Sequence, residues 1–240
     1  MNFRRLSMLA AAAALLAGCG ESDSTAPAPS ADEAPGTVEA DPHTVGPSGP
    51  GEATDAPMPE PVDDEGERLY RKGLYKEAIA HWTKAAAEGD AYANYRLGVE
   101  YLDAKVVERD VEKAAAYQKR AAELGDPRGM FELATLYEYG QGVEQSDKLA
   151  AKYYLMAAER GLPEAQHNIA TMFETGTGVE KDLVQAYKFY ALARAQGFDV
   201  AGFMGGGGNA PDPLKALEEV MTEEQLVEAR RQVAEFEAGE

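Results

Sequence analysis

The side chains that could carry out chemistry are few in this 240-residue sequence. It contains one cysteine, Cys19, and three histidines scattered along the chain. A single cysteine excludes an intrachain disulfide, and without a second cysteine the histidines give no zinc-site spacing. No H-E-x-x-H segment, nucleophile elbow or Walker pattern occurs. The sequence therefore predicts a protein that is not an enzyme and binds no metal, with Cys19 as its candidate for covalent chemistry.

The surroundings of Cys19 are those of a secretory signal. Two arginines precede an apolar run that is shorter than the ~20 residues needed to span a bilayer. The run ends in Leu16-Ala17-Gly18-Cys19, which resembles the lipobox of bacterial lipoproteins. The resemblance implies that residues 1–18 are a cleaved lipoprotein signal peptide and that Cys19 carries diacylglycerol and fatty acyl lipid. The alternative is an ordinary signal peptide whose cysteine is accidental.

The segment after Cys19 has the composition of an extended linker. At the position after Cys19, an Asp would resemble an inner-membrane retention signal. The chain has Gly20 there, and the absence of the Asp favours the outer membrane, facing the periplasm. Residues 19–61 contain nine of the 13 prolines and no Lys, Arg, Phe, Trp or Tyr. Such a segment cannot bury enough apolar area to offset its chain entropy, so we expect a disordered tether. The tether either holds a folded domain away from the membrane or serves only to attach it.

Charge and apolar content restrict the class of partner. The chain has 42 acidic and 23 basic side chains, a net charge of −19. Nucleic-acid binding is excluded, because phosphate backbones need a basic face that displaces counterions. The apolar content of 45% is enough for a packed core.

A repeat of 36 residues organises the rest of the sequence. Residues 127–162 and 163–198 are identical at 13 of 36 positions. Glycine and alanine recur at the same spacing over longer stretches: Gly89, Gly125, Gly161 and Gly197; Ala78, Ala114, Ala150 and Ala186; Ala85, Ala121, Ala157 and Ala193. Tandem units at this period are typical of stacked helical repeats.

Each period predicts two helices. The first, as in Pro127 to Glu138, has apolar residues three and four apart, and the second ends at a glycine such as Gly161. Alanines at fixed positions let the helices approach closely. One pair cannot bury its apolar face alone, so the repeats are expected to stack into a solenoid.

One turn departs from the pattern. In the last two repeats, the loop between the two helices contains glycines. The repeat at 91–126 has Ala104-Lys105-Val106-Val107 at the same place. Left-handed backbone costs ~1–2 kcal/mol when a Cβ is present. We therefore expect that this turn takes another shape.

These residues resemble a known repeat family. The pattern A-x3-LG-x2-Y, G-x-GV and D-x3-A-x3-Y-x2-A-x3-G is similar to the Sel-one-like repeat, a relative of the tetratricopeptide repeat. The resemblance implies an all-α protein, a right-handed α-solenoid of helix-turn-helix repeats, in which members are protein-binding scaffolds or adaptors without catalysis. It covers 91–126, 127–162 and 163–198, and a shorter unit at 62–90 has spacing closer to a plain tetratricopeptide repeat.

The period fails after Gly197. A glycine-rich linker at 199–211 precedes a helix that starts at Asp212 or Pro213, and Thr222 opens a second helix with a capping box. Residues 212–240 are expected to be C-terminal cap helices. The alternative is that the last helix detaches and binds a partner.

The tetratricopeptide likeness also implies a binding face. In tetratricopeptide repeats, the first helix of each pair lines the concave side of the solenoid. In this chain, nine positions would point into that side: Tyr92, Tyr95, Val99, Arg128, Phe131, Thr135, Glu164, His167 and Thr171. Tyr95, Phe131 and His167 share one position in the repeat and lie outside the core positions, so they are expected to be free of packing and to contact a partner. The alternative is that the aromatic residues pack between repeats.

The sequence leaves two functions open. One is a scaffold of the bacterial envelope that holds a protein or peptide in the concave groove. The other is an inhibitor or immunity-type protein that neutralises a secreted effector or an envelope hydrolase.

Overall fold

The structure is a computed structural model that describes residues 64–198 and 212–239. The chain divides into two units, Met1–Ser48 and Gly49–Glu240, and all the described residues belong to the second. The predicted signal peptide, the lipidation site Cys19, the tether 19–61 and the linker 199–211 lie outside the described residues.

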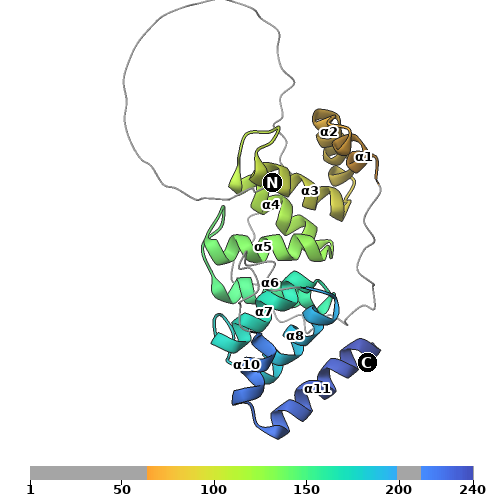
Figure 1. The fold of residues 1–240 in the computed structure, drawn as a ribbon. Coiled ribbons are helices and arrows are strands. Elements are labelled where there is room, and N and C mark those ends of the chain that lie inside the picture. Colours follow the sequence, from red (N-terminus) through yellow and green to blue (C-terminus); the bar gives the residue numbers. More distant parts are fainter. Residues whose placement is uncertain (1–63, 199–211, 240) are drawn as a thin grey trace, which may run out of the picture. The chain divides into compact units, whose positions relative to one another are not determined.

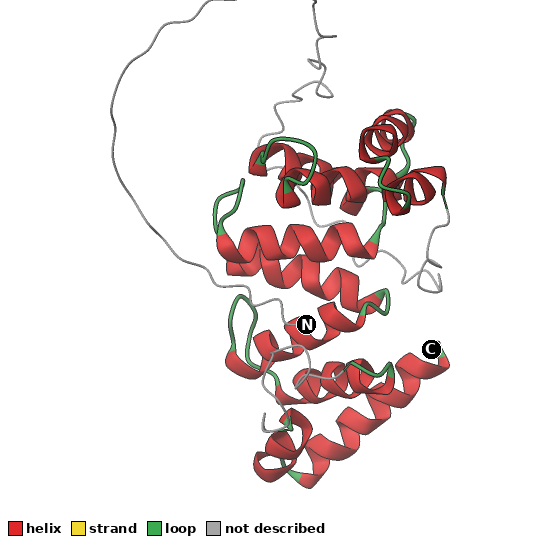
Figure 2. Cartoon of the chain, turned by 45° about the horizontal axis from the view of Figure 1, so that its top comes forward, coloured by secondary structure: helices red, strands yellow, loops and turns green. Residues whose placement is uncertain are grey.

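The described residues form ten helices and no strand (Figures 1 and 2). Each of the first eight helices packs against the next one along the chain, in four consecutive pairs. This arrangement confirms the predicted α-solenoid of helical hairpin repeats. The helices are α1 (Glu65–Arg71), α2 (Tyr75–Ala87), α3 (Ala91–Asp103), α4 (Val111–Glu123), α5 (Pro127–Tyr139), α6 (Asp147–Glu159), α7 (Pro163–Thr175), α8 (Leu183–Ala195), α10 (Pro213–Val220) and α11 (Glu223–Ala238).

Short polar side chains fix where most helices begin. A side-chain oxygen just before the helix accepts a hydrogen bond from a first-turn N–H, which would otherwise lack a partner. Pro127 and Pro163 stand in the first turns of α5 and α7, as predicted. The capping residues are Asp64, Asp90, Asp110, Asp126, Ser146, Asp182, Asp212 and Thr222.

Small residues at the repeat period make close packing possible. Ala114, Ala150 and Ala186 are fully buried, and so is Ala157. Larger apolar side chains such as Leu133 fill the space that these alanines leave between neighbouring helices. The solenoid therefore has a continuous core from α4 to α11, while a smaller cluster around Trp82 joins α2 to α3.

The turn after α3 differs from its counterparts at Val106, which lacks the positive φ of Gly142 and Gly178, as predicted. The prediction of another shape was wrong, however, at Ala104. Its φ of 54° is left-handed, as are those of its counterparts Gly140 (64°) and Gly176 (77°). The same backbone hydrogen bond spans all three loops, and it holds Ala104 in a conformation that alanine disfavours. The bonds run from the N–H of Asp110 to the carbonyl of Tyr101 (3.1 Å), Ser146 to Tyr137 (2.9 Å) and Asp182 to Phe173 (2.9 Å).

Ala104→Gly is expected to stabilise the protein. It removes the left-handed strain but adds chain entropy to the unfolded state, for a net gain of about 0.5–1 kcal/mol. Thermal unfolding should show a rise in Tm of about 1–4 °C. The control is Ala116→Gly on the exposed face of α4, where glycine should cost about 1 kcal/mol. A fall in Tm for both variants would contradict the strain at Ala104.

The C-terminal helices cover the end of the repeat stack. The predicted capping box is present, with Thr222 and Gln225 exchanging hydrogen bonds at the start of α11. Leu226 and Ala229 of α11 are buried, and α11 packs against α8 (Figure 1). The described structure thus has α11 docked on the last repeat.

Candidate functional site

The nine positions predicted for the concave face lie on the three first helices α3, α5 and α7. Thr171 is exposed, and the other eight residues are half-buried. Seven of the nine come together in two groups. Tyr92 and Tyr95 of α3 meet Arg128 of α5, and four others line a pocket further along the stack.

The expectation that Tyr95, Phe131 and His167 are free of packing was wrong. The ring of Phe131 lies 5.5 Å from that of Tyr154, and the ring of His167 lies 5.3 Å from that of Tyr190. The two tyrosines belong to the second helices and reach across to the face of the first helices. The repeat pattern places a residue on a helix, but it does not show how far a side chain from the paired helix extends.

An open pocket of about 400 Å³ lies between α5, α6 and α7. Phe131, Thr135, His167 and Thr171 line it, as predicted for a groove, whereas Tyr92, Tyr95, Val99, Arg128 and Glu164 do not. Sequence reasoning missed the other residues of its wall, which are Glu132, Glu138, Tyr139, Tyr154, Asn168 and Met172.

A hydrogen-bonded triad forms one side of the pocket. The hydroxyl of Tyr154 donates to Glu138 Oε2 at 2.7 Å and lies 3.0 Å from Thr135 Oγ1. Burial is the main cause that raises the pKa of Tyr154 far above its usual value, so the phenol stays protonated. The triad recurs one repeat later in Thr171, Glu174 and Tyr190. The recurrence of Glu138 as Glu174, 36 residues on, was the signal in the sequence that could have revealed it.

Glu132 is the pocket residue whose negative charge is least balanced by a partner. Its carboxylate makes no hydrogen bond and no ion pair with any residue that the structure describes. Burial, and after it the negative charge of Asp103, raises the pKa of its carboxyl. None of the described residues that line the pocket is a lysine or an arginine. Its electrostatic character is therefore acidic.

His167 offers a second polar group without a partner. Its Nδ1 is buried and has no hydrogen-bond partner. Burial lowers the pKa of His167, with Glu174 acting weakly in the opposite direction, so the imidazole is neutral at pH 7. A neutral imidazole has one nitrogen that accepts a hydrogen bond.

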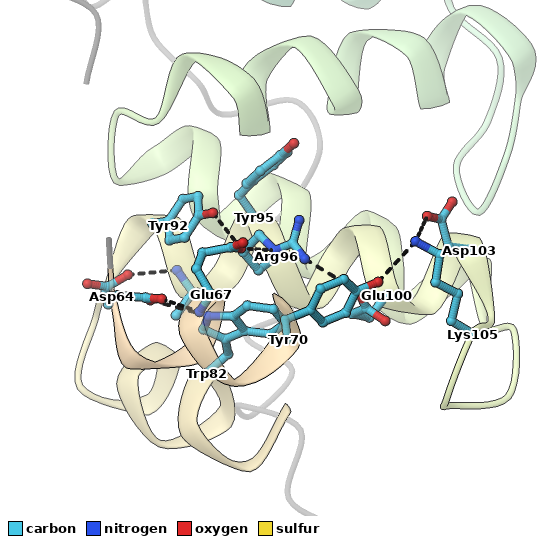
Figure 3. A network of polar contacts seen from close by, with 12 residues as sticks. Asp64, Glu67, Tyr70, Trp82, Tyr92, Tyr95, Arg96, Glu100, Asp103 and Lys105 are labelled. Atoms are coloured by element: carbon cyan, nitrogen blue, oxygen red, sulfur yellow. Dashed lines mark hydrogen bonds and ion pairs between the residues drawn. The ribbon is translucent and has the colours of Figure 1, made fainter. Parts of the chain in front are cut away.

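Two arginines on α3 and α5 lie in aromatic and acidic surroundings. Arg96 Cζ lies 4.5 Å from the ring centroid of Trp82 and 4.9 Å from that of Tyr70. Its Nε forms an ion pair with Glu67 at 2.8 Å, and its Nη2 lies 3.6 Å from the buried Glu100. Figure 3 shows these side chains gathered from α1, α2 and α3.

Arg128 repeats the arrangement on α5. Its Cζ lies 4.5 Å from the ring of Tyr92 and 5.2 Å from that of Tyr95. Two of its nitrogens donate to the carboxylate of Asp126, at 3.0 and 2.6 Å. Both arginines therefore combine cation–π contact with a carboxylate partner.

Within residues 64–198 and 212–239, no group of three or more His, Cys, Asp or Glu side chains could hold a metal ion. In the same part of the chain, no helix has the length and apolar character needed to cross a membrane.

The family follows from comparison of the sequence with family models. The Sel1 repeat model matches 65–90, 91–126, 127–162 and 163–198, more than half of the chain. The chain belongs to the Sel1 repeat family. The first unit, for which the spacing had favoured a plain tetratricopeptide repeat, is matched by the same Sel1 model. Sel1 repeats act as protein-binding scaffolds and are generally non-catalytic.

The chain is also similar to several solved structures. A protective antigen of uropathogenic Escherichia coli with an SLR fold is 28% identical, with a TM-score of 0.59 over 70% of this chain and 36% of its own. This chain thus spans about a third of that antigen. A Sel1 repeat protein from Oxalobacter formigenes is 33% identical over 52% and 95% of the two chains (TM-score 0.49). An immunity protein from Pseudomonas aeruginosa is 20% identical over 75% and 84% (TM-score 0.34). No protein with a curated description matches the chain.

Proposed function

We propose that this Sel1 repeat protein is a non-catalytic scaffold of the bacterial envelope, anchored to a membrane through Cys19, that binds a protein or peptide in the pocket between α5, α6 and α7. The main support is the pocket itself. Its walls combine the rings of Phe131, Tyr154 and His167 with carboxylates, and Tyr139 at its edge is 63% exposed. Aromatic side chains beside an open pocket are frequent anchors for a protein partner.

The anchor is supported by the sequence around Cys19. A lipidated cysteine followed by a long proline-rich tether would hold the repeats away from the outer membrane, on its periplasmic side. One site with several acyl chains supplies stable attachment, whereas a single chain is marginal. We expect the wild-type protein in the membrane fraction without residues 1–18, and Cys19→Ala as an uncleaved precursor. Cleavage of that variant at the usual place would refute lipidation.

The pocket is tested by site-specific photo-crosslinking in bacteria. A photoreactive amino acid replaces Tyr139, and in a second version of the full-length chain it replaces Val227 on α11, which is similarly exposed at 58%. A discrete protein adduct is expected from position 139 and none from position 227. The reverse pattern would move the binding site to the C-terminal helices, and no adduct at either position would refute the proposed function. If the adduct contains a secreted effector or an envelope hydrolase, the scaffold acts as an inhibitor.

A further inference from the structure

Two arginines lie in aromatic and acidic surroundings, Arg96 in the repeat 91–126 and Arg128 in the repeat 127–162. Arg96 lies against rings of the preceding helix pair and beside two carboxylates, and Arg128 lies against rings of α3 and pairs with Asp126. In both cases the cation comes from the first helix of the next pair. The stack thus places aromatic rings and carboxylates where a guanidinium can bind.

The pocket between α5, α6 and α7 also has rings and carboxylates, but none of the described residues that line it is a lysine or an arginine. The positions 36 residues after Arg96 and Arg128 are Glu132 and Glu164, so each arginine is replaced by an acid. Glu132 lacks any ion pair within the described residues, and Glu164 Oε2 is buried without a hydrogen-bond partner. Of these two acids only Glu132 lines the pocket, together with aromatic rings and His167, whose Nδ1 has no hydrogen-bond partner.

We infer that this pocket binds the guanidinium of an arginine in a partner polypeptide, an assignment that rests on the proposed protein-binding function. The guanidinium stacks on the rings of Phe131 and Tyr139 and donates to Glu132 and to Glu138. Glu138 already accepts from Tyr154 through Oε2, which leaves Oε1 for the ligand. The pocket volume of about 400 Å³ is sufficient for one such side chain and its neighbours.

Arginine fits this site better than lysine. A guanidinium is planar, stacks on aromatic rings and presents several donors in a fixed geometry, whereas an ammonium is a compact and strongly hydrated charge. The chain itself places an arginine on aromatic rings at two places, Arg96 and Arg128. A free amino acid fits less well than a peptide, because its carboxylate would be repelled by Glu132 and Glu138.

The test is an NMR titration of the full-length chain at physiological ionic strength. The probes are capped pentapeptides of glycine and alanine with a central arginine, lysine or citrulline, and free arginine. The arginine peptide is expected to shift the amides of 131–139 and 167–172, and citrulline, which lacks the charge, to bind about tenfold more weakly. Shifts spread over the acidic surface, equal binding of citrulline, or tighter binding of free arginine would overturn the assignment.

Two variants with the same change of charge identify the carboxylate involved. Glu132→Gln should weaken binding of the arginine peptide about tenfold, while Glu180→Gln, on the exposed loop after α7, should leave it unchanged. Unfolding is not expected to complicate the result. The pKa of Glu132 is raised in the folded chain, so its stabilising contribution exists only at low pH and is lost as the pH rises through that pKa. At pH 7 the glutamine variant should therefore be at least as stable as the wild type.

The same variant separates this inference from the proposed function. If crosslinking at position 139 still captures the partner in Glu132→Gln with unchanged yield, the pocket binds a protein without an arginine, and only the inference fails. If position 139 gives no adduct even in the wild type, both fail. Loss of the adduct in Glu132→Gln, together with its retention in Glu180→Gln, is the supporting result.

Discussion

Gly178→Ala is expected to lower the Tm by about 6–12 °C, which corresponds to about 3 kcal/mol in a protein of this size. Gly178 has a φ of 71°, and a Cβ built on it would lie 2.2 Å from the carbonyl oxygen of Asp147. That oxygen belongs to the first turn of α6, in the preceding repeat. Because the clash is with backbone, it can be relieved only by moving one repeat away from the other.

Gly176→Ala is the matched control for this prediction. Gly176 is also left-handed, with a φ of 77°, but its Cβ would meet the Cβ of Lys181 at 3.4 Å, an ordinary contact. Its cost should be limited to about 1 kcal/mol for the backbone conformation. Thermal unfolding of both variants separates the two causes. Equal losses would show that the contact between repeats does not require a glycine at 178.

Arg96→Leu is expected to destabilise the N-terminal repeats by about 3 kcal/mol. The substitution removes the cation that pairs with Glu67 and stacks on Trp82, and it leaves Glu100, which is 1% exposed, without a positive neighbour. A buried carboxylate without a partner is unfavourable, because its lost hydration is not replaced. Chemical denaturation monitored by Trp82 fluorescence measures the loss, since Trp82 is the only tryptophan.

A double variant tests the cause. Position 100 corresponds to Leu136 and Met172 in the later repeats, so Glu100→Leu supplies the apolar side chain usual at this place. In the Arg96→Leu background it should recover most of the lost stability. Arg68→Leu, which removes an exposed ion pair with Glu65, should cost less than about 1 kcal/mol. Failure of the double variant to recover would mean that the stacking on Trp82, not the charge of Glu100, dominates.

The repeat units were predictable because their signals are local and recur. Alanines that must be buried and glycines such as Gly161 that end helices can be read from spacing alone. Ala104 shows the limit of this reasoning. Its intrinsic preference argues against left-handed backbone, but a loop held by hydrogen bonds and by its two helices overrides that preference.

The candidate site was predictable only in part. Spacing placed Phe131, Thr135, His167 and Thr171 on one face, and these residues do line the pocket. It missed Glu132 and Glu138, because acidic residues in an acidic protein normally form a solvated surface. Their significance depends on the rings beside them and on the absence of a basic partner among the described residues, which are properties of the assembled structure.

The contact of a glycine loop with the preceding repeat has a consequence for how such proteins diversify. The Gly142 loop lies against Val111 in the same way that the Gly178 loop lies against Asp147, one period later. Deleting one 36-residue unit in frame would therefore bring the Gly178 loop onto Val111 through an interface that already exists. Unequal recombination between repeats can thus remove or duplicate a unit, and with it a whole binding pocket, without requiring a new surface to evolve.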